Sequence, residues 1–136
     1  MPAPVELIAS IPLFEGVDPR TVQQMAQSFK ERDFAAGETI AEQGKGGIGF
    51  FVIEQGEAEV TIDGDVVATL GPGKHFGEVA LIDDHARTAT VTAKTELHTY
   101  GLTAWDFRQF VEGNATIAWR LLEQLAKLLR ESYERH

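Results

Sequence analysis

The sequence predicts a mainly β domain with flanking helices, arranged as an antiparallel sandwich or roll. Short strand-like runs fill residues 31–101, glycine-containing turns separate these runs, and apolar residues at helical spacing occur before and after this region. Several short strands at such intervals favour an antiparallel arrangement over a parallel sheet. With 136 residues we expect one domain, comprising residues 1–136, with a β-region at about 31–101 and C-terminal helices at about 103–135.

The N-terminal part is predicted to be helical. Residues 5–10 form a short helix, and an apolar segment interrupted by proline follows at residues 11–14. Asp18 is a favourable N-cap and Pro19 suits the first helical position, so a second helix is expected to begin there. Its apolar residues recur at helical spacing and should pack one face on a core: Val22, Met25, Ala26 and Phe29.

The β-region is predicted to contain short strands at residues 39–41, 50–53, 57–62, 66–70, 88–93 and 96–100. Asp63-Gly64 lies between two of them and is a strong signal for a two-residue hairpin turn. Residues 76–81 follow a Gly-Pro-Gly turn and are predicted to form a single helical turn.

Helical spacing returns after the β-region. Thr103 is expected to cap a helix that runs to Val111, and Gly113-Asn114 should end it. A final amphipathic helix follows, whose leucines we expect to serve mainly as core. Its basic residues are expected on a solvated face: Arg120, Lys127 and Arg130. Three of its leucines also have a spacing compatible with a short homodimer seam: Leu122, Leu125 and Leu129.

Charge and composition exclude several classes of function. The formal net charge is −9, from 12 basic and 21 acidic residues, which disfavours direct binding to a nucleic-acid backbone. The chain has no cysteine, so it has neither disulfides nor thiolate metal ligands. We see no signal peptide and no apolar run near the roughly 20 residues needed to span a bilayer, so a cytoplasmic location is expected.

One stretch, residues 76–93, carries the chemistry; we call it the cassette motif. It reads Phe-Gly-Glu-Val-Ala-Leu and, a few residues later, Arg-Thr-Ala-Thr-Val. Gly77 allows a ligand to approach the main chain, and free N–H groups at a helix start suit an anion. Arg87 can donate two parallel hydrogen bonds to a phosphate, and Glu78 can accept one from a sugar hydroxyl. The motif therefore favours a small phosphorylated nucleoside as ligand.

The cassette motif strongly resembles the phosphate-binding cassette of cyclic nucleotide-binding domains. The resemblance extends upstream to residues 11–14, 37–44 and 50–56, and covers about residues 5–130. It implies an eight-stranded antiparallel β-roll, a double-stranded jelly roll, with N-terminal helices and a C-terminal helix pair. It also implies a regulatory domain rather than an enzyme, which binds a cyclic nucleotide and signals by repositioning its C-terminal helix.

By this resemblance each site residue has an expected role. Glu78 would hold the ribose 2′-hydroxyl and Arg87 the cyclic phosphate, helped by the main chain of Gly77, Val79 and Ala80. Thr88 stands where family members that tolerate guanine carry a threonine, although cyclic AMP binders can also carry it. Both ligands therefore stay open, with cyclic AMP favoured, and no cofactor or metal is expected.

Two departures from the family pattern stand out. Many members carry proline just before the arginine, whereas this chain has Ala86, which leaves the loop less constrained. Members that regulate transcription continue into a helix-turn-helix domain, and none follows here before His136. We therefore expect the signal from ligand binding to pass to a protein effector or an attached domain.

Two rival functions stay open. The chain could be a structural or protein-interaction module that has lost its ligand, which Ala86 favours. It could also be a metal enzyme on a small β-barrel, but His75 and His98 are too sparse for that, and the four histidines lack metal-site spacing. We expect these histidines to be structural or exposed. The glycine-rich residues 44–49 lack the Gly-Lys-Ser/Thr ending of a P-loop and predict a hairpin loop.

Overall fold

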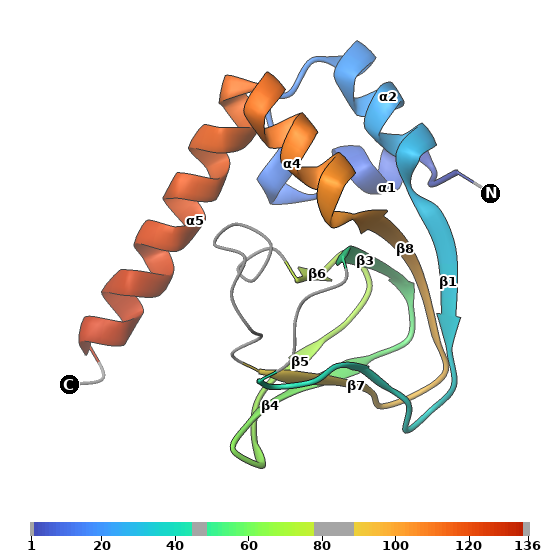
Figure 1. Cartoon of the computed structure of the whole chain (residues 1–136), viewed down its shortest axis with the longest axis vertical. Coiled ribbons are helices and arrows are strands. Elements are labelled where there is room, and N and C mark those ends of the chain that lie inside the picture. The colour runs from blue at the N-terminus through green and yellow to red at the C-terminus, as the bar shows by residue number, and fades with distance from the viewer. Residues whose placement is uncertain (1, 45–48, 78–88, 135–136) are drawn as a thin grey trace.

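The computed structural model describes residues 2–44, 49–77 and 89–134. Two four-stranded sheets form a roll, with helices packed at one end (Figure 1). Sheet A has the order β1-β8-β3-β6 and sheet B the order β2-β7-β4-β5, and every strand pair is antiparallel. This confirms the predicted eight-stranded antiparallel roll with flanking helices. The strands are β1 (Lys30–Phe34), β2 (Thr39–Ala41), β3 (Gly49–Gln55), β4 (Ala58–Ile62), β5 (Asp65–Leu70), β6 (His75–Phe76), β7 (Thr90–Ala93) and β8 (Leu97–Thr103).

Both predicted N-terminal helices form, and a short 3₁₀ helix that was not predicted lies between them. They are α1 (Val5–Ala9), the 3₁₀ helix η1 (Pro12–Phe14) and α2 (Pro19–Ser28). The Asp18 side chain caps α2, because its Oδ2 accepts a hydrogen bond from the backbone N–H of Thr21 at 3.1 Å. Hydrophobic residues from these helices, the later helices and sheet A form one core, the helix-side core: Ala3, Ile8, Ile11, Leu13, Phe14, Val22, Met25, Ala26, Phe29, Phe50, Val52, Tyr100, Leu102, Phe107, Ile117 and Leu121.

A second core lies between the two sheets. We call it the inter-sheet core: Phe34, Ile40, Ala41, Phe51, Ile53, Ala58, Phe76, Val91, Ala93 and Leu97. Strand β3 joins the two cores, because its side chains alternate. Phe50 and Val52 enter the helix-side core, whereas Phe51 and Ile53 enter the inter-sheet core. This alternation explains why residues 49–53 are buried without a polar face.

The predicted hairpin turn at Asp63-Gly64 is confirmed. Strands β4 and β5 pair up to Ile62 and Asp65, which leaves two turn residues. Both have positive φ, +52° at Asp63 and +86° at Gly64, as a type I′ turn requires. Aspartate and glycine tolerate this backbone region better than other residues do, which explains the sequence signal.

Two strands differ from the prediction. Strand β1 is absent from the predicted set, and so is β6, which is only two residues long. Phe76 was expected to begin a helical turn, and that is wrong. It pairs with Phe51 in the β3–β6 ladder, and the two rings stack with centroids 5.3 Å apart. This long-range packing overrides the local pattern, and the rest of the expected turn lies outside the described residues.

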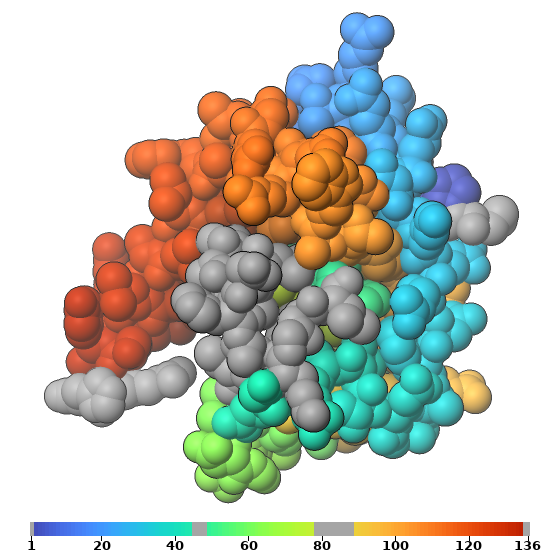
Figure 2. Space-filling model, in the orientation of Figure 1, coloured from blue at the N-terminus to red at the C-terminus, as the bar shows by residue number. Residues whose placement is uncertain are grey.

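The C-terminal helices are α4 (Ala104–Gly113) and α5 (Ala115–Glu134). Thr103 caps α4 as predicted, because its Oγ1 accepts a hydrogen bond from the N–H of Asp106 at 3.1 Å. Asn114 separates the helices and accepts a hydrogen bond from the N–H of Ile117 through Oδ1, at 3.2 Å. In Figures 1 and 2, α5 leads away from α4 along one side of the molecule.

Helix α5 buries less of itself than predicted. Ile117 and Leu121, near its start, are 0% and 4% exposed. Three leucines further along were expected mainly as core, and that is wrong. Leu122, Leu128 and Leu129 are 56%, 46% and 54% exposed and do not belong to the helix-side core.

Candidate functional site

The predicted ligand site depends on residues 76–93, of which the structure describes only the two ends. Gly77 is the predicted site residue that is described. It is half-buried and has a φ of +108°, a region that favours glycine. Glu78, Val79, Ala80, Arg87 and Thr88 lie outside the described residues. The described frame of the predicted site consists of the strands that hold its two ends.

Those two ends belong to different sheets. Strand β6 lies in sheet A and β7 in sheet B, so residues 78–88 connect one sheet to the other. Phe76 and Val91 are 6% and 5% exposed, and both contribute to the inter-sheet core. Both ends of the segment are thus fixed to the same hydrophobic cluster.

A hydrogen-bond network fixes the start of β7. Thr90 Oγ1 accepts a hydrogen bond from the backbone N–H of Gln43 at 2.9 Å. The Gln43 amide in turn pairs with the hairpin turn, since its Oε1 accepts from the Asp63 N–H at 2.9 Å and its Nε2 donates to Asp63 Oδ1 at 3.0 Å. Sequence reasoning missed these residues, because Gln43 and Thr90 are 47 positions apart. No local signal could have linked them.

The approach to Gly77 is fixed in a comparable way. The backbone of Ile53 donates to the Lys74 carbonyl at 2.9 Å, and its carbonyl accepts from the N–H of Gly73 at 2.8 Å. These bonds hold the turn before β6 against the central strand β3. Main-chain bonding on one side and the Gln43 network on the other therefore position the strands at both ends of the segment.

A groove of about 510 Å³ lies beside this turn, between α5 and the roll. One wall is formed by η1 and residues 70–75 of the roll. The other is the α5 face that bears Arg120, Glu123, Gln124 and Lys127. The groove thus brings the C-terminal helix close to the chain that leads into the cassette motif. Its volume lies in the usual range of small-molecule sites.

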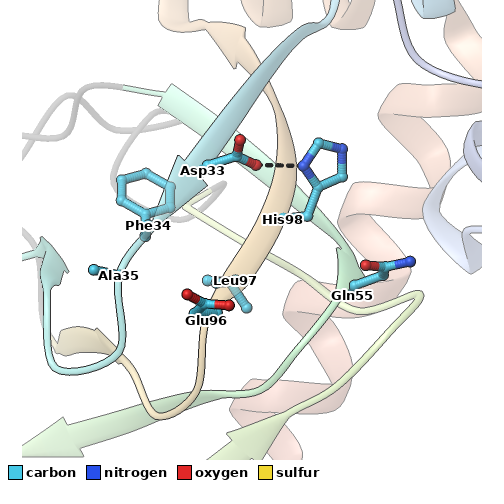
Figure 3. Close-up of a pocket in the computed structure, with 7 residues that line it drawn as sticks. All are labelled: Asp33, Phe34, Ala35, Gln55, Glu96, Leu97 and His98. Carbon is cyan, nitrogen blue, oxygen red and sulfur yellow. Dashed lines mark hydrogen bonds and ion pairs between the residues drawn. The ribbon is translucent and has the colours of Figure 1, made fainter.

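A second groove, of about 410 Å³, lies beside β1 and β8 and has an acidic lining (Figure 3). There His98 Nδ1 pairs with the Asp33 carboxylate, and its Nε2 lies 3.4 Å from Glu54 Oε1. The hydrogen bond with Asp33 raises the pKa of His98, although burial opposes this. An anionic phosphate is disfavoured next to these carboxylates. Within the described ranges, no group of histidines and carboxylates is arranged to hold a metal ion.

Comparison with known proteins identifies the family. The sequence profile described as "Cyclic nucleotide-binding domain" matches residues 31–114, more than half of the chain. The chain belongs to the cyclic nucleotide-binding domain family. This match includes the whole cassette motif and ends before α5. It confirms the resemblance inferred from the motif.

Two relatives of this domain are described as a kinase regulatory subunit and an activator protein. A cAMP-dependent protein kinase regulatory subunit of Yarrowia lipolytica is 39% identical over 92 residues, which are 66% of this chain and 24% of the relative. The crystal structure of the Thermus thermophilus catabolite activator protein is 29% identical, with a TM-score of 0.82 over 91% of this chain and 61% of that one.

A third relative is described as part of a cAMP-independent kinase. The regulatory subunit of a cAMP-independent protein kinase A from Trypanosoma brucei is 25% identical, with a TM-score of 0.83 over 96% of this chain and 47% of that chain. The present chain thus spans only part of the length of each of these relatives. In the described parts of this domain, no helix is long and apolar enough to cross a membrane.

Proposed function

We propose that this chain acts as a single regulatory domain that binds a cyclic nucleotide and has no catalytic activity. The proposed site comprises Gly77, Glu78, Val79, Ala80, Arg87 and Thr88. The observation that carries the proposal is that, in a chain of this family, the two ends of the cassette motif lie in β6 and β7. Its two ends are fixed to one core, which suits a segment that must hold a small ligand in a defined place.

The proposed chemistry divides the ligand between two side chains. The Arg87 guanidinium donates two parallel hydrogen bonds to the cyclic phosphate. The Glu78 carboxylate accepts a hydrogen bond from the ribose 2′-hydroxyl, a charge-assisted bond. Gly77 has no Cβ, so its main chain can approach the ligand closely.

The proposal specifies the purine base of the ligand, adenine or guanine, less closely than the phosphate and the ribose. The Yarrowia relative is described as cAMP-dependent, which supports cyclic AMP. Thr88 is compatible with cyclic GMP as well, and we propose cyclic AMP as the preferred ligand. The cytoplasmic location expected from the sequence stays a prediction.

The proposed output is a shift in the position of α5. A ligand favours one of two positions when it binds that position more tightly. Exposed apolar residues on the later turns of α5, including Leu122 and Leu129, are available to a protein effector, an attached domain or a second copy of the chain. A homodimer through this helix is therefore part of the proposal.

Thermal unfolding with added nucleotide tests the proposal. A ligand at about 100 times its dissociation constant adds about 2.7 kcal/mol of stability, which for a chain of this size raises Tm by roughly 8 °C. We expect this for millimolar cyclic AMP and not for linear 5′-AMP, which lacks the ring-closed phosphate. If neither cyclic AMP nor cyclic GMP raises Tm, the proposed function is wrong.

A second candidate is a structural or protein-interaction module of the same fold that binds no cyclic nucleotide. Ala86, in place of the usual proline, favours it, and so does the cAMP-independent trypanosome relative. The same thermal experiment separates the two candidates, since this module would show no shift with any of the nucleotides.

A further inference from the structure

The groove between α5 and the roll has a different charge balance from the chain as a whole. Acidic residues outnumber lysine and arginine 21 to 12 in the sequence, but this groove is lined by three basic side chains and two carboxylates. Lys74 comes from the turn before β6, and Arg120 and Lys127 come from α5, so positive charge lies on both walls. Hydrophobic residues of η1 and the end of β5 also line it: Pro12, Leu13 and Leu70. The groove thus combines apolar surface with basic groups.

The two carboxylates of this groove interact with Arg120. Its NH1 donates a hydrogen bond to Glu123 Oε1 at 2.8 Å, and its Nε donates to the backbone carbonyl of Glu15 at 3.0 Å. The hydrogen bond with Glu123 raises the pKa of Arg120, and the negative charge of Glu15 acts in the same direction, although burial opposes both. The Arg120 side chain is 32% exposed and bonded on two sides, so the expectation that it belongs to a solvated face is wrong.

The two lysines of the groove carry the charge that is left over. Both are exposed, and neither Lys74 nor Lys127 takes part in the ion pairs formed between described residues. The net charge of −9 repels an anion at long range, but the Debye length is about 8 Å at physiological ionic strength. Local charges therefore decide what the groove attracts, and the lysines on its opposite walls favour an anion.

The walls of the groove are anchored before any ligand binds. Ile117 and Leu121 fix the start of α5 in the helix-side core, and Leu13 fixes η1 in the same core. Main-chain hydrogen bonds with Ile53 hold residues 73–74 against β3. A preformed groove of about 510 Å³ is the usual setting of a small-molecule site, since little has to be ordered on binding.

We propose that this groove is a second binding site, separate from the cassette motif, for a small organic anion with an apolar body, such as a medium-chain alkyl carboxylate or an aryl carboxylate. Lys74 and Lys127 attract the anionic group from the two walls, and Pro12 and Leu70 contact the apolar body. The inference does not depend on the proposed function, because these four residues lie outside the proposed nucleotide site.

The first experiment uses 8-anilinonaphthalene-1-sulfonate, an aryl sulfonate whose fluorescence rises in apolar surroundings. We expect saturable binding to the wild type and binding at least about tenfold weaker to Lys74→Glu/Lys127→Glu, because two attractive charges become repulsive. Lys30→Glu/Lys94→Glu makes the same change in net charge at two exposed lysines outside the groove, and it should bind within about twofold of the wild type. Circular dichroism checks that both variants are folded. Equal affinities in the two variants would overturn the proposal, since dye on the exposed leucines of α5 would give that result.

The second experiment measures displacement of the dye from the wild type. Octanoate should displace it, whereas acetate lacks the apolar body and octanamide lacks the charge, so each should compete at least about tenfold more weakly. Cyclic AMP should leave the dye in place. If octanamide or acetate competes as well as octanoate, or if cyclic AMP displaces the dye, the proposed site is wrong. Binding of cyclic AMP itself, measured by thermal shift, decides the proposed function separately.

Discussion

Gly77 offers a sharp test of the site, because its backbone is described and its role is predicted. An L-residue at positive φ, such as the +108° of Gly77, costs about 1–2 kcal/mol. Alanine also restricts the unfolded chain, which stabilises the fold by about 0.4–1 kcal/mol. We therefore expect Gly77→Ala to lower the free energy of unfolding by about 1 kcal/mol and Tm by roughly 3–5 °C.

The matched control for this prediction is Gly113→Ala. Gly113 ends α4 without a positive φ, and nothing lies within 4 Å of an added Cβ, so this change should be neutral or stabilising. Urea unfolding of both variants gives the stabilities, and titration with cyclic AMP gives the affinities. Because Gly77 is proposed to contact the ligand, its variant should also bind about fivefold or more weakly. Equal stability and affinity in the two variants would refute the reasoning.

Three further predictions concern single side chains. Thr99 is fully buried and its hydroxyl donates to a carbonyl of β1 at 2.7 Å, so Thr99→Val should cost about 1–2 kcal/mol in urea unfolding; no loss would contradict this bond. Because Asp33 raises the pKa of His98 above its ordinary 6.5, the stabilisation is complete below that pH and is lost as the pH rises through the raised pKa. The stability difference between wild type and His98→Gln should therefore be larger at about pH 5.5 than at about pH 8.5, and the opposite trend would be inconsistent with the pair. Glu78→Gln should weaken cyclic nucleotide binding in calorimetry less than Arg87→Ala, since an amide oxygen still accepts from a hydroxyl; a larger loss would argue against the ribose role.

Local sequence patterns predicted the elements whose causes are local. Asp18 and Thr103 cap helices through side chains that bond three residues ahead, and Asp63-Gly64 forms its turn through its own backbone preference. Strand β1 escaped prediction because four of its five residues are exposed, so it shows no alternation of apolar and polar residues. Strand β6 was not predicted because two residues are too few to show an alternation of apolar and polar side chains.

The parts of the site that could not be predicted depend on contacts between distant residues. The Gln43–Thr90 hydrogen bond joins positions 47 apart, and Arg120 reaches a carbonyl 105 positions away. A basic residue on an amphipathic helix gives no sign of such a partner, which is why Arg120 was assigned to the solvated face. The cassette motif, in contrast, is contiguous, so its identity was available from the sequence. The roles of Glu78 and Arg87 stay predictions.

Calorimetric titration of the wild type and Arg87→Ala with cyclic AMP is the most direct test of the central claim, that Arg87 holds the phosphate of a bound cyclic nucleotide. A buried phosphate left without its arginine should cost on the order of 2–5 kcal/mol. We predict that the wild type binds and that the variant, folded by circular dichroism, binds at least about thirtyfold more weakly. Equal affinities in the two proteins would contradict the account.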